Sequence, residues 1–179
     1  LKRNPSPAET AGAERFIGST AGEKSQTSGA WSYGHGRLLR DTGRVEFKSL
    51  AHYTGKVWQG GPELPGSKTG WVHWHSGGGH PGNGDHAAIL RWVAPRSTTI
   101  EITGELSRPG LKGDAVRGLV VAGRSIAGQW TVLPGKKAQT PLNLEVTAGE
   151  AIDFLVESTG SEAWDSFLWS PVIHERGEP

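Results

Sequence analysis

The sequence has 179 residues, among them 27 glycines, 11 prolines and eight tryptophans, and it has neither cysteine nor methionine. Its 19 basic and 18 acidic side chains leave a formal net charge of +1, so no overall field draws the chain to nucleic acid or to an anionic membrane. The absence of cysteine excludes disulfides and thiolate metal sites but leaves the compartment open. No apolar run approaches the roughly 18 residues of a membrane span. We expect one domain, and the missing methionine suggests a module of a longer chain.

The first 30 residues are polar and small. Within them Ser6-Pro7-Ala8-Glu9 has the form of a capping box with proline at the first helical position, which predicts a short helix or an extended arm. We expect 1–30 to be an arm or linker, 31–174 to be the folded module and 175–179 to be a tail.

From Trp31 onward, short apolar or alternating runs recur roughly every ten residues between glycine, proline and aspartate signals. No helical segment separates them, which argues against a parallel α/β fold. The pattern predicts an all-β, antiparallel β-sandwich of the jelly-roll type. The expected strands are 31–38, 45–50, 56–59, 71–75, 86–93, 98–106, 115–121, 129–133, 142–146, 151–157 and 166–173. The strands at 142–146 and 151–157 are predicted to form a hairpin.

The tryptophans are the best guide to function, because indole stacks well on sugar rings but is also a common core residue. Side-chain alternation from Trp71 to His75 places Trp71, His73 and His75 on one face of a strand and Val72 with Trp74 on the other. If Val72 faces the core, Trp71 stands in solvent beside two imidazoles, where a sugar ring could lie on the indole. The opposite orientation remains an alternative.

A glycine-rich loop follows this strand and brings further polar side chains near one another. Near the end of the chain, Trp164 follows a polar loop and is the indole most expected to be exposed, whereas Phe167 and Trp169 are expected in the core with Phe154. The residues predicted to bind a ligand are Trp58, Trp71, His73, His75, His80, Asn83, Asp85, His86 and Trp164.

Two kinds of metal site are alternatives. His73, His75, His80 and His86 could bind a transition metal, and His-x-His resembles the cupin motif, although the cupin glutamate is replaced here by glycine and His80. A structural calcium ion would use carboxylates instead. The carboxylates considered for it are Asp85, Asp114, Asp153, Glu157 and Asp165, with Asp114, Asp153 and Asp165 as the preferred set. Solvated turn aspartates are the simpler reading, and no cofactor is certain.

No enzyme motif survives inspection, so we expect a protein that is not an enzyme. No Gly-x-Ser-x-Gly elbow is present, and sequence alone does not place two carboxylates across a glycosidic bond. A loop at 61–69 imitates a phosphate-binding loop, but a β-strand follows it where a helix N-terminus is needed.

Three stretches carry a resemblance to a known family. They are Trp31-Ser32-Tyr33-Gly34 with Val57-Trp58-Gln59-Gly60-Gly61-Pro62; Gly78-Gly79-His80-Pro81-Gly82 with His86-Ala87-Ala88 and Arg91-Trp92-Val93-Ala94-Pro95; and Ile152-Asp153-Phe154 with Asp165-Ser166-Phe167-Leu168-Trp169-Ser170-Pro171. They resemble the β-sandwich module inserted in large planctomycetal exported proteins that also carry cytochrome c-type domains. The resemblance runs from about Trp31 to Ile173 and implies a non-catalytic jelly-roll unit like a carbohydrate-binding module. It also implies an extracytoplasmic location, which would be secreted, periplasmic or at the cell surface.

The leading hypothesis is therefore a module that binds a polysaccharide or oligosaccharide through exposed tryptophans and polar loop residues. Replacing Trp71 or Trp164 by alanine is expected to weaken binding and to leave the melting temperature nearly unchanged. The alternative is an interaction domain that packs on neighbouring domains of its parent chain. A histidine-liganded metal site ranks third.

Overall fold

The computed structural model describes residues 30–176, and every helix or strand within that range is a β-strand. The strands in chain order are β1 (Ala30–Leu39), β2 (Arg44–Ser49), β3 (His52–Tyr53), β4 (Val57–Gln59), β5 (His73–His75), β6 (Gly78–His80), β7 (Ala87–Val93), β8 (Thr98–Thr103), β9 (Glu105–Ser107), β10 (Val116–Ala122), β11 (Ser125–Val132), β12 (Lys137–Gln139), β13 (Leu142–Val146), β14 (Ala151–Ser158), β15 (Phe167–Leu168) and β16 (Val172–Arg176). The predicted helix or arm before Ala30 lies outside the described residues. No helix in the described range is long and apolar enough to cross a membrane.

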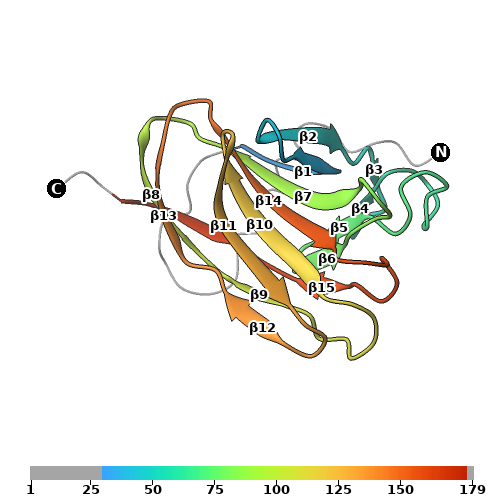
Figure 1. Ribbon diagram of the computed structural model, residues 1–179. Coiled ribbons are helices and arrows are strands. Elements are labelled where there is room, and N and C mark those ends of the chain that lie inside the picture. Colours follow the sequence, from blue (N-terminus) through green and yellow to red (C-terminus); the bar gives the residue numbers. More distant parts are fainter. Residues whose placement is uncertain (1–29, 177–179) are drawn as a thin grey trace.

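The strands form a sandwich of antiparallel sheets (Figure 1). One layer is a six-stranded sheet in the order β11-β10-β14-β7-β1-β2. The other consists of a seven-stranded sheet, β12-β9-β15-β6-β5-β4-β3, and a three-stranded sheet, β13-β8-β16. The chain passes from β8 to β9 across Gly104, whose carbonyl accepts a backbone hydrogen bond from Thr140, so the smaller sheet continues the larger one. The prediction of an all-β sandwich of the jelly-roll type is confirmed.

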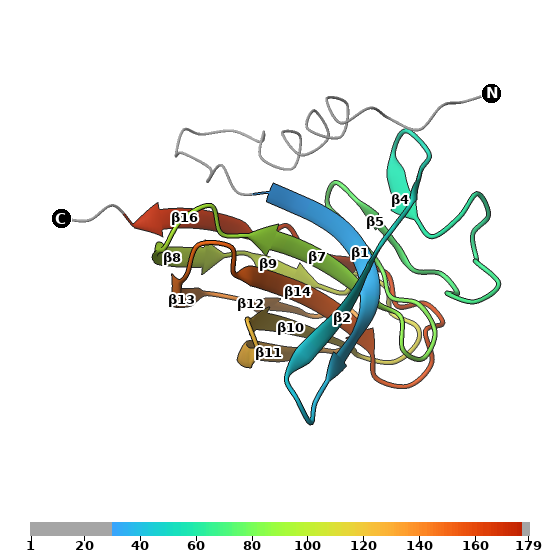
Figure 2. The same cartoon turned by 90° about the horizontal axis from the view of Figure 1, so that it is seen from above.

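Apolar side chains fill the space between the layers, and others form a second, smaller cluster on the outer face of the six-stranded sheet. The predicted central strand, β7, lies between β14 and β1 and is buried on both faces. Its inward Leu90 and Trp92 belong to the main core, whereas its outward Ile89 belongs to the second cluster. Val45 and Phe47 of β2 cover that cluster, because β1 curves and carries β2 across the outer face (Figure 2). The six-stranded sheet is therefore partly buried on both sides.

The predicted hairpin at 142–146 and 151–157 is wrong. Strand β13 pairs with β8, whereas β14 pairs with β10 and β7 in the other layer. The turn between them binds Ala94 instead: the Ala94 N–H donates to Glu150 and the Gly149 N–H donates to the Ala94 carbonyl. Each strand alternates as predicted, but the turn carries the chain from one sheet to the other.

Several predicted strand boundaries also differ. The strand predicted at 98–106 divides at Gly104 into β8 and β9, and the strand predicted at 166–173 divides before Pro171, which has no N–H, into β15 and β16. Strands β3, β6 and β12 were not predicted. In β6 the glycines have no β propensity, and the strand exists because its backbone pairs with both β5 and β15.

Candidate functional site

The exposed face of β5 carries the candidate site. Val72 and Trp74 are fully buried, Trp71 is 43% exposed, and His73 and His75 are half-buried. Of the two orientations that the sequence left open, the structure therefore has the one in which Trp71 and the two imidazoles share the outward face. The burial of Val72 and Trp74 fixes this orientation. Side chains alternate along a strand, so when these two point into the core, Trp71, His73 and His75 point to the other side.

Strand β6 adds a third imidazole to this face. His73 and His80 are paired across the two strands, and their ring centroids lie 5.9 Å apart in a stacked arrangement. The His75 ring lies 6.2 Å from that of His73, and the Trp71 ring lies 6.5 Å from that of His80. We call Trp71, His73, His75 and His80 the indole-imidazole cluster.

Backbone groups fix the hydrogen-bonding role of each imidazole. Nδ1 of His73 lies 2.8 Å from the Trp71 carbonyl oxygen, which can only accept, so Nδ1 carries the proton and Nε2 of the neutral ring accepts. Nδ1 of His75 accepts from the Gly77 N–H at 3.2 Å, so Nε2 of that neutral ring donates. Nδ1 of the buried His80 donates to the Pro81 carbonyl at 2.6 Å. The face thus offers one imidazole acceptor and one imidazole donor side by side.

The two half-buried rings remain neutral at physiological pH. Desolvation lowers the pKa of His73, the hydrogen bond to the Trp71 carbonyl opposes this, and the nearby His80 and His75 lower it further. Desolvation also lowers the pKa of His75. Both effects favour the uncharged imidazole, which donates from one nitrogen and accepts at the other.

Glu162, which the sequence did not single out, fastens Trp71 in place. Its Oε2 accepts a hydrogen bond of 3.1 Å from the Trp71 N–H. Gly70 precedes Trp71 with φ of +66°, and a Cβ there would lie within 2.5 Å of both Glu162 carboxylate oxygens. Position 70 therefore needs glycine for its backbone conformation and for this close approach.

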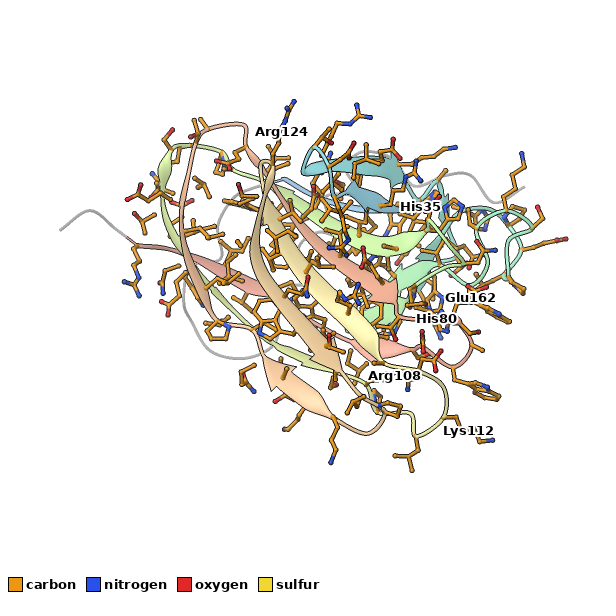
Figure 3. The ribbon with its side chains drawn as sticks, in the orientation of Figure 1. His35, His80, Arg108, Lys112, Arg124 and Glu162 are labelled. Atoms are coloured by element: carbon orange, nitrogen blue, oxygen red, sulfur yellow. The ribbon has the colours of Figure 1, made fainter. Side chains whose placement is uncertain are left out.

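A buried ion pair lies beneath the loops on the same side of the molecule. Arg108 and Asp165 are both fully buried, and Nη2 of Arg108 donates to Oδ1 of Asp165 at 2.9 Å. The same guanidinium donates to the carbonyls of Gly110 and Lys112. Burial raises the pKa of Asp165, and the neighbouring Ser158 and Arg108 act in the opposite sense. Figure 3 shows His80, Glu162, Arg108 and Lys112 along one side of the molecule. The pair thus joins the loop 109–113 to the loop 161–165.

Trp164 is the most exposed tryptophan of the described residues, as predicted, at 64%. Among the described residues, Trp164 is also the only one other than glycine with a positive φ, at 73°. The ammonium of Lys112 lies 5.0 Å from its ring centroid. Glu162, two residues earlier, contacts Trp71, so the same loop reaches both exposed indoles.

The remaining predicted ligand residues do not join the cluster. Trp58 is paired with the inward Trp74 and packs against the core and two tyrosines, so it lies on the opposite face of the sheet. Nδ1 of His86 lies 3.0 Å from Nδ1 of His35, and the Asp85 carboxylate forms an ion pair with Arg37 at 2.8 Å. Asn83 is exposed in the same loop. The second half of the glycine-rich loop therefore turns toward β1, which leaves His80 as its contribution to the cluster.

The three preferred calcium ligands have separate partners. Asp153 forms two hydrogen bonds with Arg91, at 2.7 and 2.8 Å, and Asp165 pairs with Arg108. Asp114 accepts from the Ser161 N–H at 3.0 Å. Within residues 30–176, no group of three or more histidine, aspartate or glutamate side chains is arranged to hold a metal ion. The structure does not bring the predicted calcium ligands together, because arginines and a backbone N–H engage their carboxylates. Of the predicted histidine ligands, His73, His75 and His80 are neighbours, whereas His86 lies beside His35.

A cleft with a volume of about 410 Å³ lies elsewhere, between the end of β1 and the strands β10 and β14. Its walls carry the ion pairs of Arg37 with Asp85 and of Arg40 with Glu157. None of the four residues of the indole-imidazole cluster lines it. The charged residues of these two ion pairs already have partners, so we place the candidate site on the outward face of β5, with His80 of β6 beside it.

No family model and no curated protein matches the chain. A family 35 carbohydrate-binding module from an environmental isolate is 13% identical over 65% of this chain and 77% of its own, with a TM-score of 0.34. A structure of CBM51-2 in complex with GlcNAc and INT domains from Clostridium perfringens ZmpB is 13% identical over 89% of this chain and 30% of its own, with a TM-score of 0.42. GITRL from bushbaby is 10% identical over 82% of this chain and 96% of its own, with a TM-score of 0.32. Several matched structures are thus carbohydrate-binding modules, while the fold assignment here rests on the sheet topology.

Proposed function

We propose that this protein is a non-catalytic carbohydrate-binding module that holds a sugar unit against Trp71 and the imidazoles of His73 and His75. One observation carries the proposal: an indole that is 43% exposed stands beside neutral imidazoles whose donor and acceptor roles are set by the backbone.

A pyranose ring has an apolar C–H face and a rim of hydroxyls. The indole of Trp71 offers a flat apolar surface for the first, and such stacking is a common use of exposed aromatic rings. Each hydroxyl both donates and accepts, so it can donate to Nε2 of His73 and accept from Nε2 of His75. Because both rings are neutral, the face suits uncharged hydroxyls. One or two stacked rings give micromolar to millimolar affinity, since small ligands gain limited free energy per atom.

The nearby carboxylates support a binding role in place of hydrolysis. Glu162 accepts the Trp71 N–H, and Asp165 is buried against Arg108, so both already have structural partners. Glycoside hydrolysis would require two carboxyl groups that face each other across the scissile bond. We place the module in an exported, multidomain parent chain, as the sequence resemblance implies, where it would keep the neighbouring domains close to polysaccharide.

Affinity electrophoresis against a panel of plant and marine polysaccharides tests the proposal. The wild-type chain should be retarded by at least one glycan, and Trp71→Ala should lose that retardation while keeping its melting temperature. Ile126→Ala is the matched control, because Ile126 is 46% exposed on β11 and lies outside the cluster. Equal mobility of the wild-type chain in every gel, with the fold intact, contradicts the proposal. That Trp164 also contacts sugar stays a prediction.

A further inference from the structure

Large apolar side chains gather on loops at one end of the molecule. Leu111 is 82% exposed, Leu133 is 58% exposed and Trp164 is 64% exposed, which makes them the three most exposed large hydrophobic residues of the described range. They come from three loops, 109–113, 133–136 and 161–165. We call Leu111, Leu133 and Trp164, with Lys112 and Lys136, the loop tip.

Close contacts show that these loops form one surface. The Gly135 N–H donates to the carbonyls of Arg108 and Gly110, and a Cβ at Gly135 would lie 2.8 Å from Cδ2 of Leu111. A Cβ at Gly113 would lie 3.1 Å from Cβ of Trp164. The loops are thus adjacent, and their leucines and tryptophan point outward from a shared base.

The backbone of Trp164 adopts a conformation that costs free energy. A bulky residue with φ of 73° is strained, and such strain persists only where the surroundings enforce it. The buried pair of Arg108 and Asp165, next to Trp164 in the chain, provides that support. A strained backbone conformation therefore holds an exposed indole, whose ring centroid lies 5.0 Å from the Lys112 ammonium.

Exposed basic side chains lie beside the apolar residues of these loops. Lys112 lies over the ring of Trp164, and Lys136 is exposed in the loop that carries Leu133. The next residue, Lys137, forms an ion pair of 3.1 Å with Glu105. The carboxylate of Asp165 is paired with the Arg108 guanidinium. Glu162 and Asp114 keep their negative charges, and each accepts a hydrogen bond from a backbone N–H, of Trp71 and Ser161 respectively. The charged residues of the loop tip itself are the two lysines.

We propose that the loop tip inserts into the surface of an anionic lipid bilayer. Leucine and tryptophan enter the boundary between head groups and acyl chains, and lysines beside them are attracted to anionic head groups. A protein interface is depleted in lysine, and a rigid partner would need a matching pocket for a leucine that protrudes as far as Leu111. A fluid lipid surface needs no such pocket. This inference goes beyond the sugar site and uses none of the residues of the indole-imidazole cluster.

Cosedimentation of the full chain with sucrose-loaded vesicles tests the proposal. Vesicles of equal parts phosphatidylcholine and phosphatidylglycerol should sediment the wild-type chain, and vesicles of phosphatidylcholine alone should sediment about ten-fold less. The double variant Leu111→Ser with Trp164→Asn should lose at least about ten-fold in binding. Asparagine tolerates a positive φ, so this variant should fold, and its melting curve checks that. Added salt should weaken binding to the anionic vesicles.

Ile126→Ser is the matched control, because it also removes an exposed aliphatic side chain. Ile126 is two residues from Arg124, which Figure 3 shows at the opposite end of the molecule from Lys112, so this variant should bind vesicles like the wild-type chain. The proposal is overturned if folded wild-type chain does not sediment with anionic vesicles, or if the double variant sediments equally well. It is also overturned if Trp164→Asn abolishes glycan retardation and leaves vesicle binding unchanged, because the loop tip would then belong to the sugar site. Trp71→Ala separates the two proposals: it should abolish glycan retardation and leave vesicle binding intact.

Discussion

The backbone N–H of Trp71 donates a hydrogen bond of 3.1 Å to Oε2 of Glu162, a residue 91 positions later in the chain. This bond joins the start of the strand that carries the imidazoles to the loop that carries Trp164. The position of the Trp71 ring therefore depends on a side chain far away in sequence.

Replacing Glu162 by alanine should weaken glycan binding by about five-fold, because one hydrogen bond of roughly 1 kcal/mol no longer holds Trp71 in its binding orientation. Glu162→Gln retains an acceptor oxygen and should bind nearly as well as the wild-type chain. Affinity electrophoresis on the glycan that retards the wild-type chain measures both. Equal retardation of Glu162→Ala and wild type would show that this bond does not position the ring.

Glycan binding should be insensitive to pH from neutral down to the ordinary histidine range and should fall only at lower pH. The lowered pKa values of His73 and His75 keep both rings neutral until the pH drops below about 6.5, and protonation then removes the acceptor at Nε2 of His73. Tryptophan fluorescence titrated with glycan at several pH values, on protein checked for folding at each, measures this. Binding that strengthens in acid would contradict the assigned roles.

The stability of the fold should fall as the pH drops from about 6.5 to about 4. Burial, followed by the charges of His86 and Lys48, lowers the pKa of His35 from 6.5 to about 4. Between these pH values the unfolded chain binds a proton at His35 that the folded chain does not. The contribution of His35 to the free energy of unfolding is therefore complete above pH 6.5 and is lost as the pH falls to about 4. Its size is about 3 kcal/mol at most.

Urea unfolding of wild type and His35→Gln at neutral and acidic pH measures that contribution. The pH dependence should be reduced in His35→Gln and retained in His174→Gln, which leaves the His35 and His86 pair intact. An equally steep loss of stability in His35→Gln would mean that other groups cause it.

Removing the carboxylate of Asp165 should destabilise the fold by about 3 to 5 kcal/mol, because the charge of Arg108 would stay buried without its partner. Asp114→Ala is the matched control, since it removes an exposed carboxylate that binds one backbone N–H and should cost only about 1 kcal/mol. Urea unfolding compares the two variants. Similar stabilities for both would mean that water reaches Arg108 in the Asp165→Ala variant.

The alternation of single strands could be predicted from the sequence, because it depends only on neighbouring residues. Val72 and Trp74 are inward and Trp71 is outward for that reason, and β13 matches the predicted 142–146. The pairing of strands could not be predicted in the same way. The residues 148–150 have the form of a hairpin turn, yet their partner is the backbone of Ala94, directly after β7.

The candidate site was only partly predictable for the same physical reason. Trp71, His73 and His75 share one face because of local strand alternation. The position of His80 depends instead on the glycine-rich strand β6, which pairs with β5 through its backbone. Glu162 resembles any surface glutamate in the sequence, and its role arises from a contact across 91 positions. His35 and His86, which the chain places 3.0 Å apart, likewise show no shared motif.

The pairing of β16 with β8 has a consequence for synthesis. Val172 lies opposite Thr103, so this edge of β8 has no partner until β16 leaves the ribosome. A nascent chain must keep that exposed edge away from other polypeptides for the time needed to translate the intervening residues. Truncation before residue 172 would leave this edge of β8 permanently unpaired, so incompletely translated chains would be expected to aggregate in the cell.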